Sequence, residues 1–176
     1  MARLLLMTVA LLMSVSCVRS KAAEKVKAGD ILPDFVLKSE SYGELSAADL
    51  RGKVVYLCFF TTWCPNCQEE LHAIQTRMYP EFKEEEGFEI IAVGREHTDE
   101  ELMKYNEVRN FDFPLYPDPD REVYSLFADE TVPRAYVVDR DGVVVDAAAG
   151  YDSGHFETVL KTIGDLLDDG TSVETD

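Results

Sequence analysis

The sequence predicts an α/β domain in which helices flank a central mixed β-sheet, and three observations indicate this class. The continuous apolar run Val54 to Phe60 is rich in β-forming residues, as is typical of a central strand buried on both faces. A helical pattern from about Pro65 to Glu85 and a strand pattern from Glu89 to Gly94 complete a β-α-β unit, whose strands should be parallel. Two further β-rich segments, Ala135 to Asp139 and Val143 to Ala149, are joined through an Asp-Gly pair that strongly favours a hairpin.

Shorter patterns predict the elements around the first half of this sheet. Residues 35–37 are expected to form a short first strand, and residues 45–53 a brief helical turn followed by a loop. The long helix after the central strand has apolar residues at steps of three and four, which places them on one face. These residues are Leu71, Ile74, Met78 and Phe82.

In the second half, residues 98–110 are expected to form a helix, because they open with a Thr-x-x-Glu capping box. Its expected inward-facing residues are Leu102, Tyr105 and Val108. Residues 114–120 contain three prolines and should be an irregular loop, and residues 121–127 a short helix. The last helix spans about Ser153 to Leu167. Its apolar stripe consists of Phe156, Val159, Leu160, Ile163 and Leu167.

Length and composition fit one compact domain. The chain has 176 residues, of which 46 % are apolar and 29 % are charged, values close to those of ordinary globular proteins. Its 34 acidic and 17 basic residues give a formal charge of −17. Because nucleic-acid binding requires a basic surface that neutralises phosphates, this charge argues against a nucleic-acid partner.

The N-terminal residues have the layout of an export signal. Arg3 precedes an apolar run from Leu4 to Leu12, which is too short for a membrane-spanning helix, and small residues then lead to Cys17. Ser14 and Ser16 are suited to cleavage before residue 17. The segment also resembles a bacterial lipoprotein box, in which Cys17 would be lipidated and become the new N-terminus, although such boxes usually carry Leu or Val at the position of Ser14.

We therefore divide the chain into a signal peptide (1–16), a lipoprotein-type tether (17–28), one folded α/β domain (29–167) and an acidic flexible tail (168–176). Lipidation of Cys17 is the preferred interpretation; plain secretion and an uncleaved anchor are the alternatives. In every case the domain lies outside the cytoplasm, in the cell envelope or periplasm, and the preferred case attaches it to the membrane through the lipid anchor.

The four cysteines have three different expected roles. Cys17 belongs to the export signal, whereas Cys58 lies within the apolar run 54–60, where a free Cys behaves as a small buried hydrophobic residue. Cys64 and Cys67 form a close pair at the junction of a strand and a helix, which indicates a redox-active dithiol. No cysteines remain for a structural disulfide framework.

Pro65 gives the two sulfurs of this pair different positions. A proline disfavours helical backbone at the residue before it and suits the first position of a helix, so we expect Cys64 to be the N-cap. The free amides of the first turn and the helix dipole would stabilise a thiolate there. Cys67 lies inside the first turn, where it is placed to resolve a mixed disulfide rather than to meet a substrate. Cys64 is thus the expected attacking thiol and Cys67 the resolving thiol.

A zinc site is the alternative for a Cys-x-x-Cys pair. Structural zinc is usually held by four ligands in two close pairs. Cys58 and the histidines His72, His97 and His155 supply no second pair at such a spacing. We therefore expect no bound metal and no cofactor.

The segment from Tyr56 to Glu70, with its Trp-Cys-x-x-Cys motif and an acid three residues later, resembles the TlpA/ResA-like branch of the thioredoxin superfamily. The resemblance runs from about residue 29 to residue 167 and includes Gly52-Lys53 and residues 137–142. It implies the thioredoxin fold and an exported, often membrane-anchored thiol–disulfide oxidoreductase. It also implies that Val132-Pro133 is a cis peptide bond that packs beside the Cys pair and offers its backbone to a substrate peptide.

Glu70 is the expected proton partner of Cys67. It shares a helical face with Cys67 next to Leu71, so burial would raise its pKa and suit it to proton exchange with the thiol. The resemblance supports this role, because members of that branch carry their active-site Glu at the same offset. Ordinary thioredoxins place a buried acid at the position that Cys58 occupies here. The alternative is a solvated helix residue, as expected for Glu69.

Two further residues belong to the expected substrate-binding surface. Trp63 should flank the site as an apolar contact surface, as it does in relatives, and Pro65 follows Cys64 directly in the sequence. His72 stands where relatives often have Pro, and we expect it to be a surface histidine.

These observations predict an enzyme that reduces disulfides of exported proteins and receives electrons from a membrane donor. A disulfide oxidase or isomerase is the first alternative, since it uses the same residues at a higher reduction potential. A thiol peroxidase is less favoured, because Thr61-x-x-Cys64 matches only half of the peroxiredoxin motif and Leu57 stands where that motif has Pro. A redox-inactive binding module of the same fold is the non-enzymatic alternative.

Overall fold

The computed structural model describes residues 24–171, and its centre is a five-stranded sheet in the order β5-β4-β3-β6-β7. Its strands are β3 (Val54–Phe60), β4 (Phe88–Arg95), β5 (Leu115–Asp118), β6 (Arg134–Val138) and β7 (Val144–Ala149). β3 and β5 pair with β4 in parallel, whereas the β3–β6 and β6–β7 pairs are antiparallel. The predicted β-α-β unit, the hairpin and the mixed α/β class are confirmed.

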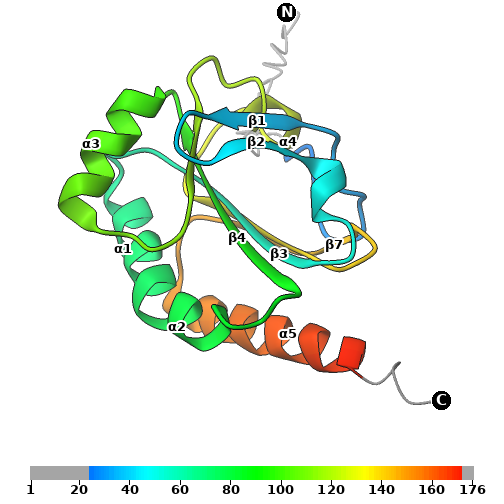
Figure 1. Ribbon diagram of the computed structural model, residues 1–176. Coiled ribbons are helices and arrows are strands. Elements are labelled where there is room, and N and C mark those ends of the chain that lie inside the picture. The colour runs from blue at the N-terminus through cyan, green and yellow to red at the C-terminus, as the bar shows by residue number, and fades with distance from the viewer. Residues whose placement is uncertain (1–23, 172–176) are drawn as a thin grey trace, which may run out of the picture.

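Helices cover one face of this sheet, and a hairpin with two short helical segments covers the other (Figure 1). The first face carries α1 (Pro65–Ala73), α2 (Tyr79–Phe82), α3 (Asp99–Arg109) and α5 (Ser153–Thr171). The second carries β1 (Val36–Ser39), β2 (Gly43–Ser46), the 3₁₀ turn η1 (Ala47–Leu50) and α4 (Tyr124–Phe127).

β3 separates the two hydrophobic cores, and every one of its residues is buried. Because strand side chains alternate between faces, one set faces the helical core and the other the hairpin core. The first set is Val54, Tyr56, Cys58 and Phe60, and the second is Val55, Leu57 and Phe59. The chemistry at the end of β3 therefore starts from a strand that packing holds from both sides.

The predicted helix 65–85 is present, but it is interrupted and shorter. Between α1 and α2 lies η2 (Ile74–Met78), a π-helical segment, and the helical run ends at Phe82. Pro80 has no N–H to bond the carbonyl four residues before it, and the Tyr79 N–H instead bonds the Ile74 carbonyl, five residues back. The predicted apolar face of this helix is nevertheless confirmed, since all four of its residues are buried.

Two local predictions were wrong. Residues 114–120 contain β5, because Pro117 is tolerated in an edge strand that pairs only with β4. Val108 on α3 is 78 % exposed, so the inward face of that helix is limited to Leu102 and the partly buried Tyr105. The helical turn predicted within residues 45–53 is confirmed as η1, although residues 45 and 46 belong to β2, which pairs with β1.

Several predictions fall on residues that the structure does not describe. The signal peptide (1–16) and Cys17 lie outside the described residues, as do residues 18–23 of the tether and 172–176 of the tail. α5 continues to Thr171, past its predicted end at Leu167. Within residues 24–171, no helix combines the length and the apolar character needed to cross a membrane.

Candidate active site

Cys64 is the N-cap of α1, as the position of Pro65 predicts. Its backbone is extended, with φ −90° and ψ 114°, and Pro65 is the first residue of the helix. The Cys64 Sγ accepts a hydrogen bond from the Cys67 N–H at 3.3 Å. A free amide of the first turn thus points at the sulfur, which favours negative charge on it. Cys64 is partly exposed and can meet a partner molecule.

Cys67 lies behind Cys64 and has no exposed surface. Burial raises the pKa of its thiol well above the usual range, and a hydrogen bond with Cys64 adds to this effect. Both sulfurs are free thiols in the structure. The two cysteines therefore differ in access, and burial makes it harder to deprotonate Cys67.

Glu70 is buried on the same face of α1, with 3 % of its surface exposed. Burial raises the pKa of its carboxyl to about 7, although a hydrogen bond from Tyr56 opposes the rise. That bond runs from the Tyr56 hydroxyl to Glu70 Oε1 at 2.6 Å. Glu70 is therefore not a solvated helix residue, whereas its neighbour Glu69 is exposed to solvent, as expected.

The loop before β6 reaches Cys64 from the other side. Val132-Pro133 is a cis peptide bond, as the resemblance implied. The Cys64 thiol donates to the Val132 carbonyl at 3.6 Å. This backbone thus lies against the partly exposed sulfur.

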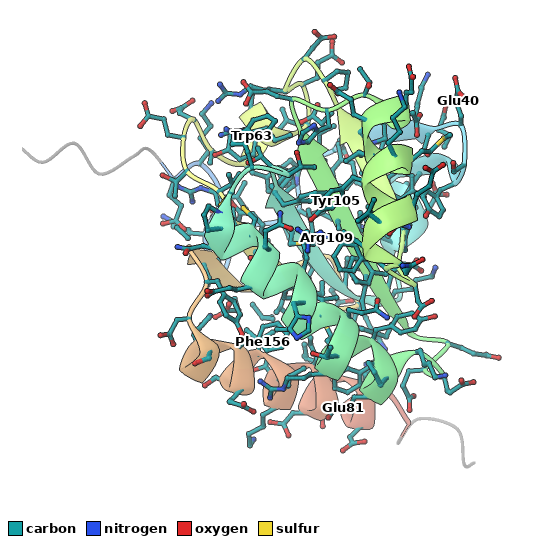
Figure 2. The ribbon with its side chains drawn as sticks, turned by 90° about the vertical axis from the view of Figure 1, so that its left-hand side faces the viewer. Glu40, Trp63, Glu81, Tyr105, Arg109 and Phe156 are labelled. Carbon is teal, nitrogen blue, oxygen red and sulfur yellow. The ribbon has the colours of Figure 1, made fainter. Side chains whose placement is uncertain are left out.

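Trp63, the residue directly before Cys64, lies at the surface, with 63 % of the residue exposed. In Figure 2 it lies at the upper end of α1, away from Phe156 and Glu81 near the lower helices. Its ring packs edge-on against His97, with the two centroids 4.8 Å apart. His72 is also exposed, as expected.

The structure brings together the predicted residues of the described part of the chain, and it adds three that the sequence did not indicate. Tyr56 supplies the hydrogen bond to Glu70, while His97 and Gln68 hold the loop that carries Trp63. Strand alternation could have placed Tyr56 on the helical face of β3. No local signal indicated that His97, beyond the end of β4, would reach the loop after β3.

Cys58 is a buried free thiol with 1 % exposure, as predicted. Burial raises its pKa well above the usual range, and the nearby Glu70 and Cys67 reinforce the effect. Of the residues from 24 to 171, no group of three or more His, Cys, Asp or Glu side chains is arranged to hold a metal ion. The chemistry that this arrangement supports is thiol chemistry: one accessible sulfur, one buried sulfur, and a buried carboxyl that can change its protonation near neutral pH.

Known proteins share this architecture. Residues 28–147 match the model of the AhpC/TSA family. The thiol-disulfide oxidoreductase ResA of Bacillus thuringiensis (strain Al Hakam) is 31 % identical over 127 residues, which cover 72 % of each chain. A solved structure described as a candidate protein disulfide isomerase, from Bacteroides thetaiotaomicron, has a TM-score of 0.80 and 26 % identity, covering 85 % of this chain and 96 % of that chain.

A second solved structure, described as a candidate thiol:disulfide interchange protein DsbE from Chlorobium tepidum, has a TM-score of 0.69 and 26 % identity. It covers 81 % of this chain and 99 % of that chain. The expected thioredoxin fold is thereby confirmed.

Proposed function

This chain belongs to the AhpC/TSA family and is a thiol–disulfide oxidoreductase of the ResA type, and we propose that it is an exported reductase of disulfides in envelope proteins. The observation that carries the proposal is the asymmetry of the Cys pair. Cys64 is accessible at the N-cap of α1, whereas Cys67 is fully buried three residues from a buried carboxyl.

In the proposed reaction, Cys64 attacks one sulfur of a substrate disulfide as a thiolate. The substrate S–S bond breaks, a mixed disulfide forms on Cys64, and the departing substrate thiolate takes up a proton from solvent. The Val132 carbonyl lies against Cys64 Sγ, and Trp63, the residue before Cys64, is exposed, so we propose that Trp63, Pro65, Val132 and Pro133 contact the substrate peptide.

Cys67 then resolves the mixed disulfide. The Glu70 carboxylate takes the Cys67 thiol proton, and the resulting thiolate attacks Cys64 Sγ and releases the second substrate thiolate, which is protonated in turn. The substrate has gained two electrons, and Cys64 and Cys67 are left as a disulfide. A membrane-bound dithiol donor would reduce that disulfide again, so the cycle needs no further cofactor.

The decisive experiment is substrate trapping. A Cys67→Ala variant should accumulate mixed disulfides on Cys64 in its native host, because the resolving thiol is missing. The matched control is Cys64→Ala/Cys67→Ala, which should trap nothing. Absence of any trapped partner on Cys67→Ala would contradict the proposal.

The direction of electron flow is tested separately. A reductase should equilibrate with glutathione at a lower potential than an oxidase or isomerase does. A potential near that of known disulfide oxidases would favour the oxidase or isomerase alternative. Rapid consumption of hydrogen peroxide by the reduced protein would instead favour a thiol peroxidase.

We propose that the protein is attached to the membrane through a lipid on Cys17. The apolar run before Cys17 supports this location. Labelling of the intact chain with a radioactive fatty acid should depend on Cys17, and Cys17→Ser should release the domain from the membrane fraction. Equal labelling of Cys17→Ser would contradict the anchor without affecting the proposed chemistry.

A further inference from the structure

In the loop between β3 and α1, two side chains from elsewhere in the fold bind the backbone of Thr62, two residues before Cys64. The Thr62 N–H donates to His97 Nε2 at 3.0 Å, and the Thr62 carbonyl accepts from Gln68 Nε2 at 3.1 Å. Both backbone polar groups of this residue are therefore bound by side chains. The position of the Trp63–Cys64 segment depends on those two side chains.

Gln68 and His97 are themselves fixed. The Tyr105 hydroxyl of α3 donates to Gln68 Oε1, and Figure 2 shows Tyr105 between α3 and α1, below Trp63. The His97 N–H donates to the Gly94 carbonyl at 3.2 Å. A Cβ at Gly94 would come within 3.3 Å of His97 Cβ and 2.7 Å of Leu102, so this close approach requires glycine.

The His97 ring is enclosed between the loop and α3. Only 3 % of His97 is exposed, and its ring lies against Trp63 at 4.8 Å and near Phe60 at 6.3 Å. Its Nδ1 is 3.8 Å from Glu101 Oε2 on α3. The ring thus connects the active-site loop to the first turn of α3.

The hydrogen bond from Thr62 determines the state of this ring. An amide N–H needs a lone pair on Nε2, so the imidazole is neutral and carries its proton on Nδ1, toward Glu101. In the charged imidazolium both nitrogens are donors. Protonation would therefore place two N–H groups against each other and break the link to Thr62.

We infer that His97 is a positioning residue for the Cys64 nucleophile. The neutral His97 ring holds the Thr62–Trp63 segment, and the protonated ring releases it. The inference deepens the proposed function, because the chemistry that it controls is the thiol exchange at Cys64. Protonation of His97 does not change Trp63 or Cys64 chemically. It changes the position of the backbone segment that carries them.

The charges around His97 come from two segments. Glu101 on α3, and Glu96 next to His97, favour the imidazolium, whereas Arg95 disfavours it. Burial has the largest effect and lowers the pKa of His97 below its usual value. The link to Thr62 is thus intact at neutral pH and breaks in acid.

Trp63 gives a direct optical readout, because it is the only tryptophan of the 176-residue chain. Its emission should change in one step as His97 is protonated below neutral pH. The measurement is made in a Cys64→Ser background, which removes the thiol next to Trp63 as another cause of a change in emission. His97→Gln should abolish the step, because a Gln amide does not titrate, whereas His72→Gln, His155→Gln and Glu70→Gln should keep it.

Exchange kinetics test the positioning role. His97→Leu removes the acceptor for Thr62 N–H and should slow alkylation of Cys64 and insulin reduction at pH 7 by about tenfold, less than the ~100-fold that a 1 Å misplacement of a reacting group can cause. His97→Gln supplies an amide oxygen at the same reach and should restore most of the rate. Circular dichroism checks that both variants are folded.

Two results would overturn the inference. One is a His97→Leu variant that is folded and exchanges as fast as the wild type, and the other is a His97→Gln variant that keeps the fluorescence step. If His97→Leu does not fold, the fluorescence of His97→Gln still decides. Neither result bears on the Cys67→Ala trap, so failure of this inference and failure of the proposed function can be distinguished.

Discussion

The Tyr56 hydroxyl donates a 2.6 Å hydrogen bond to Glu70 Oε1, joining the central strand to the active-site helix in the buried core. Two opposing effects act on this carboxyl. Burial raises the pKa of Glu70, the tyrosine hydrogen bond lowers it, and the result is a value of about 7. A carboxyl that titrates near neutral pH can both take and return the proton of a neighbouring thiol.

Removal of the tyrosine hydroxyl should shift this balance. Tyr56→Phe takes away the donor that stabilises the carboxylate, so the pKa of Glu70 should rise further above 7. The measurement is a pH titration of the Glu70 carboxyl carbon by NMR. Tyr42→Phe, at an exposed tyrosine, is the matched control. An unchanged Glu70 titration in Tyr56→Phe would show that the hydrogen bond has no effect on the carboxyl.

Glu70 should also make stability depend on pH. The pKa of its carboxyl is about 7 in the folded state and has the ordinary value of 4.5 when solvated, so the folded state binds more protons between these pH values. The free energy of unfolding therefore falls as pH rises from 4.5 to 7, by about 3 kcal/mol in total for this group. Below pH 4.5 and above pH 7, Glu70 adds no further pH dependence to the free energy of unfolding.

The test compares Glu70→Gln with Glu69→Gln by guanidinium unfolding at several pH values. Gln is neutral throughout, so Glu70→Gln should lose most of this fall and gain relative stability above pH 7. Glu69 is exposed, and its replacement should leave the profile unchanged. A Glu70→Gln profile that parallels the wild type would mean that Glu70 does not titrate near pH 7.

The three described cysteines should react with iodoacetamide at very different rates. Cys64 is partly exposed, whereas Cys67 and Cys58 are 0 % and 1 % exposed and their pKa values are raised by burial. Brief alkylation of the native reduced protein should label Cys64 first, as read by peptide mass spectrometry. Comparable labelling of Cys67 would contradict the proposed division of roles, and labelling in denaturant should equalise all three.

The N-cap of α3 offers a stability test away from the thiols. Thr98 Oγ1 accepts from the Glu101 N–H, and Glu101 Oε2 accepts from the Thr98 N–H. Thr98→Ala removes one half of this capping box and should lower the free energy of unfolding by about 1 kcal/mol. Thr158→Ala, at an exposed position within α5, is the control and should change it by less than about 0.5 kcal/mol. Equal effects would show that the cap adds nothing.

Much of the candidate site could be predicted because its determinants are local. The buried strand 54–60 follows from a continuous apolar run, and the N-cap position of Cys64 follows from Pro65. The capping box at Thr98 is formed as expected. Each of these depends on residues within one helical turn or one strand.

Other features could not be predicted because they depend on packing between distant segments. β5 contains Pro117, which local propensity assigns to a loop, yet the open edge of β4 accepts it as a strand. Val108 matches a helical stripe but lies where α3 has no neighbour to cover it, and is exposed. The π-helical segment before Pro80 is different, because its cause is local: the missing N–H of Pro80 can be read from the sequence, but an analysis of apolar periodicity alone does not detect it.

The sequence by itself determined the class of fold, the β-α-β unit and the hairpin of its sheet, and the unequal positions of Cys64 and Cys67, because periodicity, capping and proline act over a few residues. The resemblance to a known branch added the cis bond at Val132-Pro133. Only the tertiary structure decided which side chains support the site from a distance: the Tyr56 hydroxyl binds Glu70 across 14 residues of sequence, and the His97 ring binds the Thr62 N–H across 35. Such contacts form only when the sheet and helices have packed, since no local interaction brings these side chains together.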